Sequence, residues 1–157
     1  MATLEDYKKF MDEVCKLTDL PAMASDDDGL VCVTVEEDYI LNLQFVAESE
    51  KILCFIEVAE LPEDAPAAVY RDLLTGALFG RETGGGYFTM DGDTNAVVYN
   101  YLFDFATVSD SPQDFVDSLE MIFQTVEIWA VRIATGLSGE SGVEAAAEKA
   151  EDVFIQP

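Results

Sequence analysis

Side chains that could bind a metal ion occur together at one place, the segment Asp91-Gly92-Asp93-Thr94-Asn95. Oxygen ligands at alternate positions match the first half of a calcium-binding loop. The second half departs from that pattern, because Ala96 replaces the glycine of the sharp turn and Leu102 occupies the position of the bidentate glutamate. A hairpin turn rich in Asp, Asn and Gly explains the same residues. Calcium binding is therefore an alternative interpretation, and we assign no metal ligand.

Residues that could carry out catalysis are scarce. The chain contains no histidine, so it lacks the usual base for a serine or cysteine nucleophile. The carboxylate pairs Asp26/Asp28 and Asp114/Asp117 could exchange protons, but an acidic chain produces such pairs by chance. The triple glycine Gly84–Gly86 lacks the spacing of a phosphate-binding loop and precedes a predicted strand instead of a helix. We therefore expect a non-catalytic protein that needs no cofactor.

The charge balance limits the possible partners. Eight basic residues oppose 32 acidic ones, a formal net charge of −24, and no Lys or Arg occurs between Arg81 and Arg132. Nucleic acids and anionic membranes are bound by neutralising phosphate with Lys and Arg, so neither is an expected partner. The charge is compatible with a role in solubility and with attraction of a basic partner.

Cysteine usage and the N-terminal residues indicate a cytoplasmic protein. Cys15, Cys32 and Cys54 are odd in number, form no CxxC pair and lie in apolar segments, which predicts buried, reduced thiols. Acidic residues follow Met1 closely, whereas a signal peptide begins with basic residues and an apolar stretch. The longest apolar runs are far shorter than the roughly 20 residues that span a bilayer.

Hydrophobic periodicity predicts the elements of the N-terminal half. Thr3-x-x-Asp6 resembles a capping box and begins a helix that ends near Leu20-Pro21. Three strand-like runs follow at hairpin distance, which predicts an antiparallel meander. These runs are Leu30–Val35, Tyr39–Phe45 and Ile52–Val58. The third is almost continuously apolar, so we expect a central strand that is buried on both faces.

The C-terminal half is predicted to contain a second helix, a two-stranded hairpin and a long helix. These elements cover about Ala65–Phe79, Tyr87–Met90 with Ala96–Phe105, and Ser111–Gly136. The order α-β-β-β-α-β-β-α indicates an α+β fold, an antiparallel twisted sheet with flanking helices. We expect one domain over residues 1–136. Residues 137–157 are predicted to be an acidic, alanine-rich tail that can form a short helix.

The first helix carries more hydrophobic surface than a core contact requires. Its apolar arc covers roughly 160°, compared with the stripe of about 100° typical of a surface helix. Phe10 and Leu17 lie at one margin of the arc, next to Asp6 and Glu13. We therefore predict that a partner binds at Phe10, Val14 and Leu17. The nearby acids would favour a partner segment that carries Lys or Arg.

The middle of the chain resembles a known family. The segment Leu73-Leu74-Thr75-Gly76-Ala77-Leu78-Phe79-Gly80 is followed by a glycine-rich joint and the strand Tyr87-Phe88-Thr89-Met90-Asp91. Together with the helix from Leu119-Glu120 to Glu127-Ile128-Trp129, these segments resemble the class I chaperones of bacterial type III secretion, the Tir-chaperone family. That family tends to carry a Leu-Leu-x-Ala-Asn-Leu-Phe helix, and Gly76-Ala77 stands here in place of its Ala-Asn.

The resemblance implies a homodimer that binds secreted proteins. It implies a dimer interface on the second helix and the strand after it, here Leu73, Leu74, Leu78, Phe79, Tyr87 and Met90. It also implies that the chain holds a non-globular N-terminal segment of a secreted effector in extended form, by strand addition and pocket filling. A regulatory or sensory protein of the same fold, without a secretion client, is the alternative.

Overall fold

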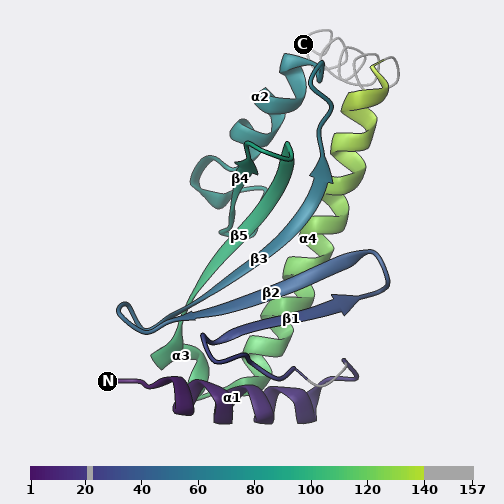
Figure 1. The fold of residues 1–157 in the computed structure, drawn as a ribbon. Helices are drawn as coiled ribbons and strands as arrows, with labels where there is room; N and C mark the ends of the chain where they lie inside the picture. Colours follow the sequence, from purple (N-terminus) through teal and green to yellow (C-terminus); the bar gives the residue numbers. More distant parts are fainter. Residues whose placement is uncertain (21–22, 140–157) are drawn as a thin grey trace, which may run out of the picture.

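A five-stranded antiparallel sheet forms the centre of the molecule, in the order β1-β2-β3-β5-β4 (Figure 1). The computed structural model describes residues 1–20 and 23–139. The strands are β1 (Leu30–Val35), β2 (Tyr39–Val46), β3 (Lys51–Glu60), β4 (Tyr87–Asp91) and β5 (Ala96–Asp104). The predicted α+β fold with an antiparallel sheet is confirmed, and β3 is the central strand, as expected.

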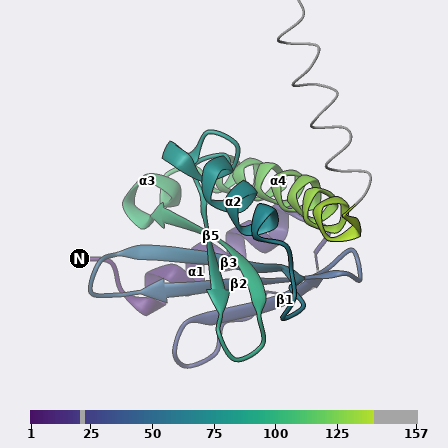
Figure 2. The ribbon, with the colours of Figure 1, turned by 90° about the horizontal axis from the view of Figure 1, so that it is seen from above.

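The longest helix runs along one face of the sheet and joins its two ends (Figures 1 and 2). The helices are α1 (Leu4–Leu17), α2 (Ala67–Gly76), the 3-10 turn η1 (Leu78–Gly80), α3 (Phe105–Ser109) and α4 (Pro112–Ser138). α4 starts beside α1 and ends beside α2, and α2, α3 and α4 lie on the same side of the strands (Figure 2). Within the described ranges, no helix has the length and hydrophobicity needed to cross a membrane.

Helix ends follow local hydrogen bonding. The predicted capping box is present, because the Asp6 backbone N–H donates to Thr3 Oγ1 (3.2 Å) and the Thr3 N–H donates to Asp6 Oδ2 (2.9 Å). α4 does not stop at Gly136 as predicted but continues to Ser138, and Gly139 follows in the left-handed region with φ 74°. Gly136 instead allows a close approach to α2, since a β-carbon there would lie 3.0 Å from Val69 Cγ2. The expected tail helix lies outside the described residues.

Two elements differ from the sequence prediction. The last strand ends at Asp104, and Phe105 begins the short helix α3, which turns the chain toward α4. The predicted second helix is divided, because α2 ends at Gly76 and Phe79 adopts a left-handed conformation with φ 55°. Periodicity detects neither change, since both hydrophobic patterns continue across the point where the backbone changes direction.

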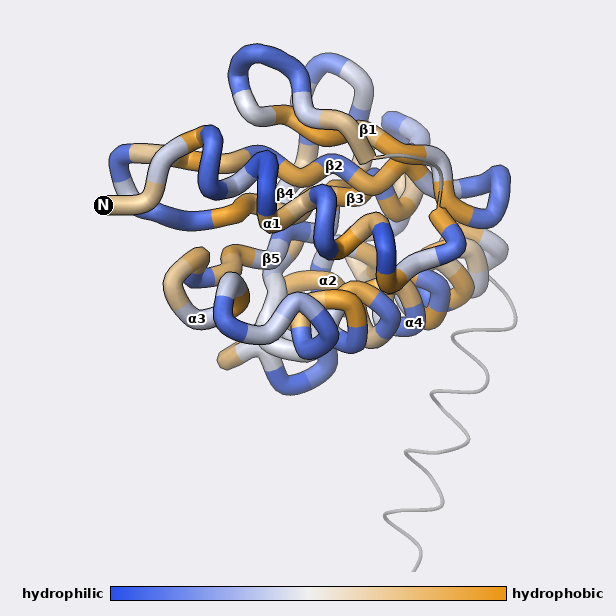
Figure 3. Tube along the Cα trace, turned by 90° about the horizontal axis from the view of Figure 1, so that it is seen from below, coloured by the Kyte–Doolittle hydropathy of each residue, from blue (hydrophilic) through white to orange (hydrophobic). Residues whose placement is uncertain are grey.

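Helices cover only one face of the sheet, so the strands are buried on that side alone. On β3 the inward side chains, Ile52, Cys54 and Ile56, are fully buried, whereas Leu53 and Phe55 on the other face are only half-buried. The expectation of two buried faces is therefore wrong for β3. Alternation of hydrophobic and hydrophilic residues is visible along the elements in Figure 3.

The same asymmetry separates the three cysteines. Cys54 faces the core, and burial raises the pKa of its thiol to about 12. Cys32 is on the uncovered face of β1 and is exposed, and Cys15 is intermediate. The prediction of buried thiols is confirmed for Cys54 and wrong for Cys32.

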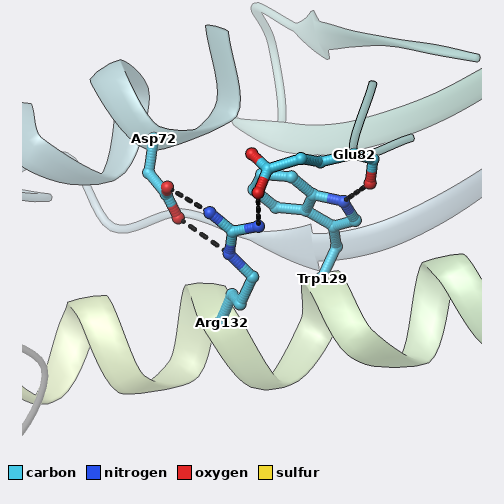
Figure 4. Close-up of polar contacts among 4 residues, drawn as sticks. All are labelled: Asp72, Glu82, Trp129 and Arg132. Atoms are coloured by element: carbon cyan, nitrogen blue, oxygen red, sulfur yellow. Dashed lines mark hydrogen bonds and ion pairs between the residues drawn. The ribbon is translucent and has the colours of Figure 1, made fainter. Parts of the chain in front are cut away.

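A cluster around Trp129 joins α4 to α2 and to the loop after η1 (Figure 4). The Trp129 indole is fully buried, and its Nε1–H donates to the Glu82 carbonyl oxygen at 2.8 Å. The Arg132 guanidinium lies 3.9 Å from the Trp129 ring centroid and forms a forked hydrogen bond with the Asp72 carboxylate. Arg132 also pairs with the Glu82 side chain at 3.6 Å. Trp129 and Arg132 of α4 therefore hold both α2 and the loop after η1 in place.

Gly76→Ala is expected to destabilise the protein, because a β-carbon would lie 2.3 Å from the Trp129 ring atoms Cη2 and Cζ2. Overpacking of this kind costs about 1–3 kcal/mol, more than the gain of up to about 1 kcal/mol from better helix propensity. Chemical unfolding followed by the fluorescence of Trp129, the single tryptophan of the chain, measures the change. Gly92→Ala is the control, since no atom lies within 4 Å of its β-carbon position. Equal stability of both variants would contradict the packing described.

Candidate functional site: a groove beside α1 and an exposed apolar cluster

Phe10 belongs to the core and not to an open surface. Its ring packs edge-to-face against Phe105 (5.6 Å between centroids) and Phe115 (5.1 Å), and only 6% of the residue is exposed. Val14, one turn further along α1, is fully buried. Val14 presents no free surface, and Phe10 presents only its exposed 6%. Of the three predicted contact residues, Leu17 alone is exposed, at 47%.

Leu17 opens onto a groove of about 580 Å³ between the end of α1, the end of β1 and the middle of α4. Apolar side chains from all three elements line it, among them Leu17, Leu20, Val35 and Phe123. Leu20 and Phe123 are half-buried, so their side chains contact both the core and the open groove. Leu17, at the C-terminal end of the apolar margin predicted on the first helix, therefore lies beside an apolar groove that the sequence analysis did not identify.

Carboxylates surround this groove. Asp19, Glu36, Glu120 and Glu127 line it, and none of its described lining residues is Lys or Arg. The pKa of the Tyr39 hydroxyl is raised, first by desolvation and then by the negative charges of Glu127, Asp38 and Glu36.

A second, shallower hollow of about 390 Å³ lies along the same margin of α1, toward the N-terminus. Asp6, Lys9, Phe10 and Glu13 line it, together with Phe105 from the start of α3. Here one basic side chain is present, and Lys9 pairs with Glu5 at 3.2 Å. The two hollows differ in charge, since the ionisable residues that line the Leu17 groove are all acidic in the described part of the chain.

The residues predicted for a dimer interface divide into one core side chain and five exposed ones. Leu73 is buried, because it packs with the core beneath α2. The others are large hydrophobic side chains with 40% or more of their surface exposed: Leu74, Leu78, Phe79, Tyr87 and Met90. We call these five residues the apolar cluster.

Phe79 is the most unusual member of the apolar cluster. It is 85% exposed, and its φ of 55° is uncommon for a bulky side chain. The Arg81 guanidinium lies 5.8 Å from the ring centroid, so one cation covers part of the ring. A strained backbone that presents an aromatic ring to solvent is typical of a binding residue.

The acidic turn at residues 91–95 forms a hairpin between β4 and β5. The Asp93 N–H donates to Asp91 Oδ1 (2.9 Å), and the Asn95 N–H donates to the Asp91 carbonyl oxygen (2.8 Å). Asn95 has a φ of 58°, which fits a turn position. Within the part of the chain that the structure describes, no group of three or more His, Cys, Asp or Glu side chains is arranged to hold a metal ion.

The groove residues on α4 escaped the sequence analysis for a geometric reason. Phe123 is next to the apolar seam of α4 but not in it, so helical periodicity alone assigns it to the surface. Glu120 and Glu127 are seven residues apart and therefore lie on the same side of the helix as Phe123. This spacing is the signal available in the sequence, but only the packing of α1 and β1 reveals that it borders a groove.

The fold and its surfaces define a class of protein: a small α+β protein with an acidic groove and an exposed apolar cluster, both suited to bind polypeptide. Residues 9–130 match the model of the Tir chaperone protein (CesT) family. A Chlamydia pneumoniae protein, CPj0713/CpB0740, is 31% identical over 111 residues, which are 71% of this chain and 82% of that protein. The chain belongs to the Tir chaperone protein (CesT) family.

Solved structures share the fold at low sequence identity. The ExsC–ExsE complex matches with a TM-score of 0.70 and 19% identity, over 83% of this chain and 95% of the other. The HopA1–SchA chaperone–effector complex gives 0.61 and 18%, with the same two coverages. The Yersinia pestis type III secretion chaperone SycH, in complex with a fragment of YscM2, gives 0.61 and 17%, over 76% and 96%. The predicted family resemblance is confirmed.

Truncation of neighbouring α1 residues should separate core from surface. Val14→Ala is expected to lower the free energy of unfolding by about 1–3 kcal/mol, because it leaves a cavity in the core. Leu17→Ala should change it by less than about 0.5 kcal/mol, since half of that side chain is already in water. Thermal and urea unfolding measure both. A large loss for Leu17→Ala would place that residue in the core instead.

Proposed function

We propose that the chain is a non-catalytic cytoplasmic chaperone that holds an extended segment of a secreted effector. Membership of the Tir chaperone family supports this function. One observation in the structure carries it: the Leu17 groove lies at the end of β1, an edge strand whose only partner among the described strands is β2. The free edge of β1 offers backbone groups to an added strand, and the groove offers a pocket for its side chains.

Holding a segment in this way requires no chemistry. The groove supplies apolar contact area through Leu17, Leu20 and Phe123, and the strand edge supplies hydrogen bonds that do not depend on the client sequence. An apolar side chain of the client that enters the groove is removed from water and from aggregation with other chains. The client would thus remain unfolded and available for export.

Purification of the tagged full chain from its native cells, followed by limited proteolysis of the complex, tests this function. We expect the protected fragment to be the N-terminal segment of a secreted protein, with little structure by circular dichroism when free. Leu17→Ala should weaken its binding by about tenfold or more. Ile40→Ala is the control, because Ile40 is equally exposed but lies on the uncovered sheet face. Protection of a folded regulatory domain would instead favour the alternative function.

We also propose that the apolar cluster forms a homodimer interface. Its side chains come from three consecutive segments, α2, η1 and β4. Leu74, Leu78 and Phe79 are close in sequence across α2 and η1, and large exposed apolar side chains that gather in one region mark an interaction site. All five side chains are uncharged, so contact between them adds no repulsion between two copies of this highly acidic chain.

Introducing charge into the apolar cluster should separate the dimer. Light scattering coupled to size exclusion is expected to give twice 17.2 kDa for the parent chain. Leu74→Asp combined with Phe79→Asp should give the monomer mass, because two buried carboxylates per copy would face each other. Met121→Asp serves as control, since Met121 is also exposed but lies on α4, outside the cluster. A parent chain that is monomeric at micromolar concentration rules out this interface.

A further inference from the structure

The Leu17 groove has apolar walls and an acidic rim. Apolar side chains from α1, β1 and α4 form its interior, and all four of its ionisable lining residues are carboxylates: Asp19, Glu36, Glu120 and Glu127. All four carboxylate residues are exposed. No ion pair with Lys or Arg is formed by any of them in the described part of the chain. An apolar side chain fits the interior, and cations fit the rim.

Two of these acids have a defined separation. Glu120 and Glu127 are seven residues apart on α4, a rise of about 10.5 Å at 1.5 Å per residue. Phe123, an apolar wall of the groove, lies between them on the same side of the helix. The two glutamates therefore lie on either side of Phe123 along α4, and Val116 and Leu119 extend the apolar lining beyond Glu120.

An extended client segment has a matching period. Alternate residues of a strand point to the same face, about 6.6 Å apart, so residues at i−2 and i+2 are separated by about 13 Å. Long Lys or Arg side chains easily span the remaining difference. Where the client segment leaves the edge of β1 and runs along α4, an apolar residue at i and basic residues at i−2 and i+2 would place the apolar side chain beside Phe123 and each cation near one glutamate.

We propose that the Leu17 groove recognises clients by this pattern, an apolar anchor flanked at two residues on either side by Lys or Arg. The inference rests on the proposed chaperone function and specifies the segment that the groove selects. Extended segments with acidic flanks would meet uncompensated like charges and be rejected. The acidic residues of the groove would thereby select client segments with basic flanks.

Three fluorescein-labelled synthetic peptides of identical length test the pattern by fluorescence anisotropy. The first is Thr-Ser-Lys-Ser-Leu-Ser-Lys-Ser-Thr, with Lys at i−2 and i+2 of Leu. The second moves both Lys to i−1 and i+1, which places them on the opposite face, and the third replaces Lys by Glu. We expect the first peptide to bind at least fivefold more tightly than the second and the third not to bind. Raising the salt concentration should reduce the difference.

A protein variant localises the effect. Glu120→Gln combined with Glu127→Gln should reduce the affinity for the first peptide about fivefold or more and remove its advantage over the second. Glu63→Gln combined with Asp64→Asn is the matched control, because it removes the same charge from an exposed loop before α2, at the other end of the molecule from α1 (Figure 1). Similar affinities of all three peptides, no binding of any at millimolar concentration, or equal effects of the two variants would overturn the proposal.

The experiments distinguish a failure of the charge pattern from a failure of the proposed chaperone function. If native cells yield a bound effector segment that the Glu120→Gln/Glu127→Gln variant holds as tightly as the parent, the charge pattern is wrong and the chaperone function stands. If the peptides bind as expected but no effector segment is recovered, the groove chemistry stands and the function is wrong. A change of molar mass in the variant would show that a second copy of the chain occupies the groove, which also contradicts the proposal.

Discussion

The burial of Trp129 is the constraint on which the rest of this structure depends. Its indole occupies the space that a side chain at position 76 would need, and it hydrogen-bonds the backbone of the loop that follows η1. Because the same turn of α4 carries Arg132, which binds Asp72 and stacks on the indole, α2 has little freedom to slide or rotate. The position of the apolar cluster follows from this contact, since the cluster begins on the outer side of α2.

The long helix α4 transmits this constraint to the opposite end of the molecule. Its buried residues pack on the sheet and, near Phe115, against α1 (Figure 1). Phe10 is held there between two aromatic rings, so the middle of α1 cannot move without disturbing the core. α1 therefore ends at a fixed place beside β1, and the groove is a consequence of where the helix stops.

The strongly acidic composition affects the groove and the apolar cluster differently. Four carboxylates line the groove, whereas the five exposed side chains of the apolar cluster are uncharged. Negative charge in a homodimer interface would cause repulsion between two copies of an acidic chain. Negative charge around a client-binding groove instead increases selectivity for basic segments. The same net charge of −24 can thus serve two different surfaces in opposite ways.

The amino-acid sequence by itself determined the elements with strong periodicity or clear caps, the α+β class and the family. The capping residues Thr3 and Asp6 and the alternation of β2 are local properties, and the structure agrees with them. Tertiary packing determines the burial of Phe10, the exposure of Cys32 and the groove at Leu17. A hydrophobic arc specifies which side of a helix is apolar, but the neighbours that cover it come from distant segments, here α3 and α4. Only their packing decides which apolar residues are core and which remain open to a partner.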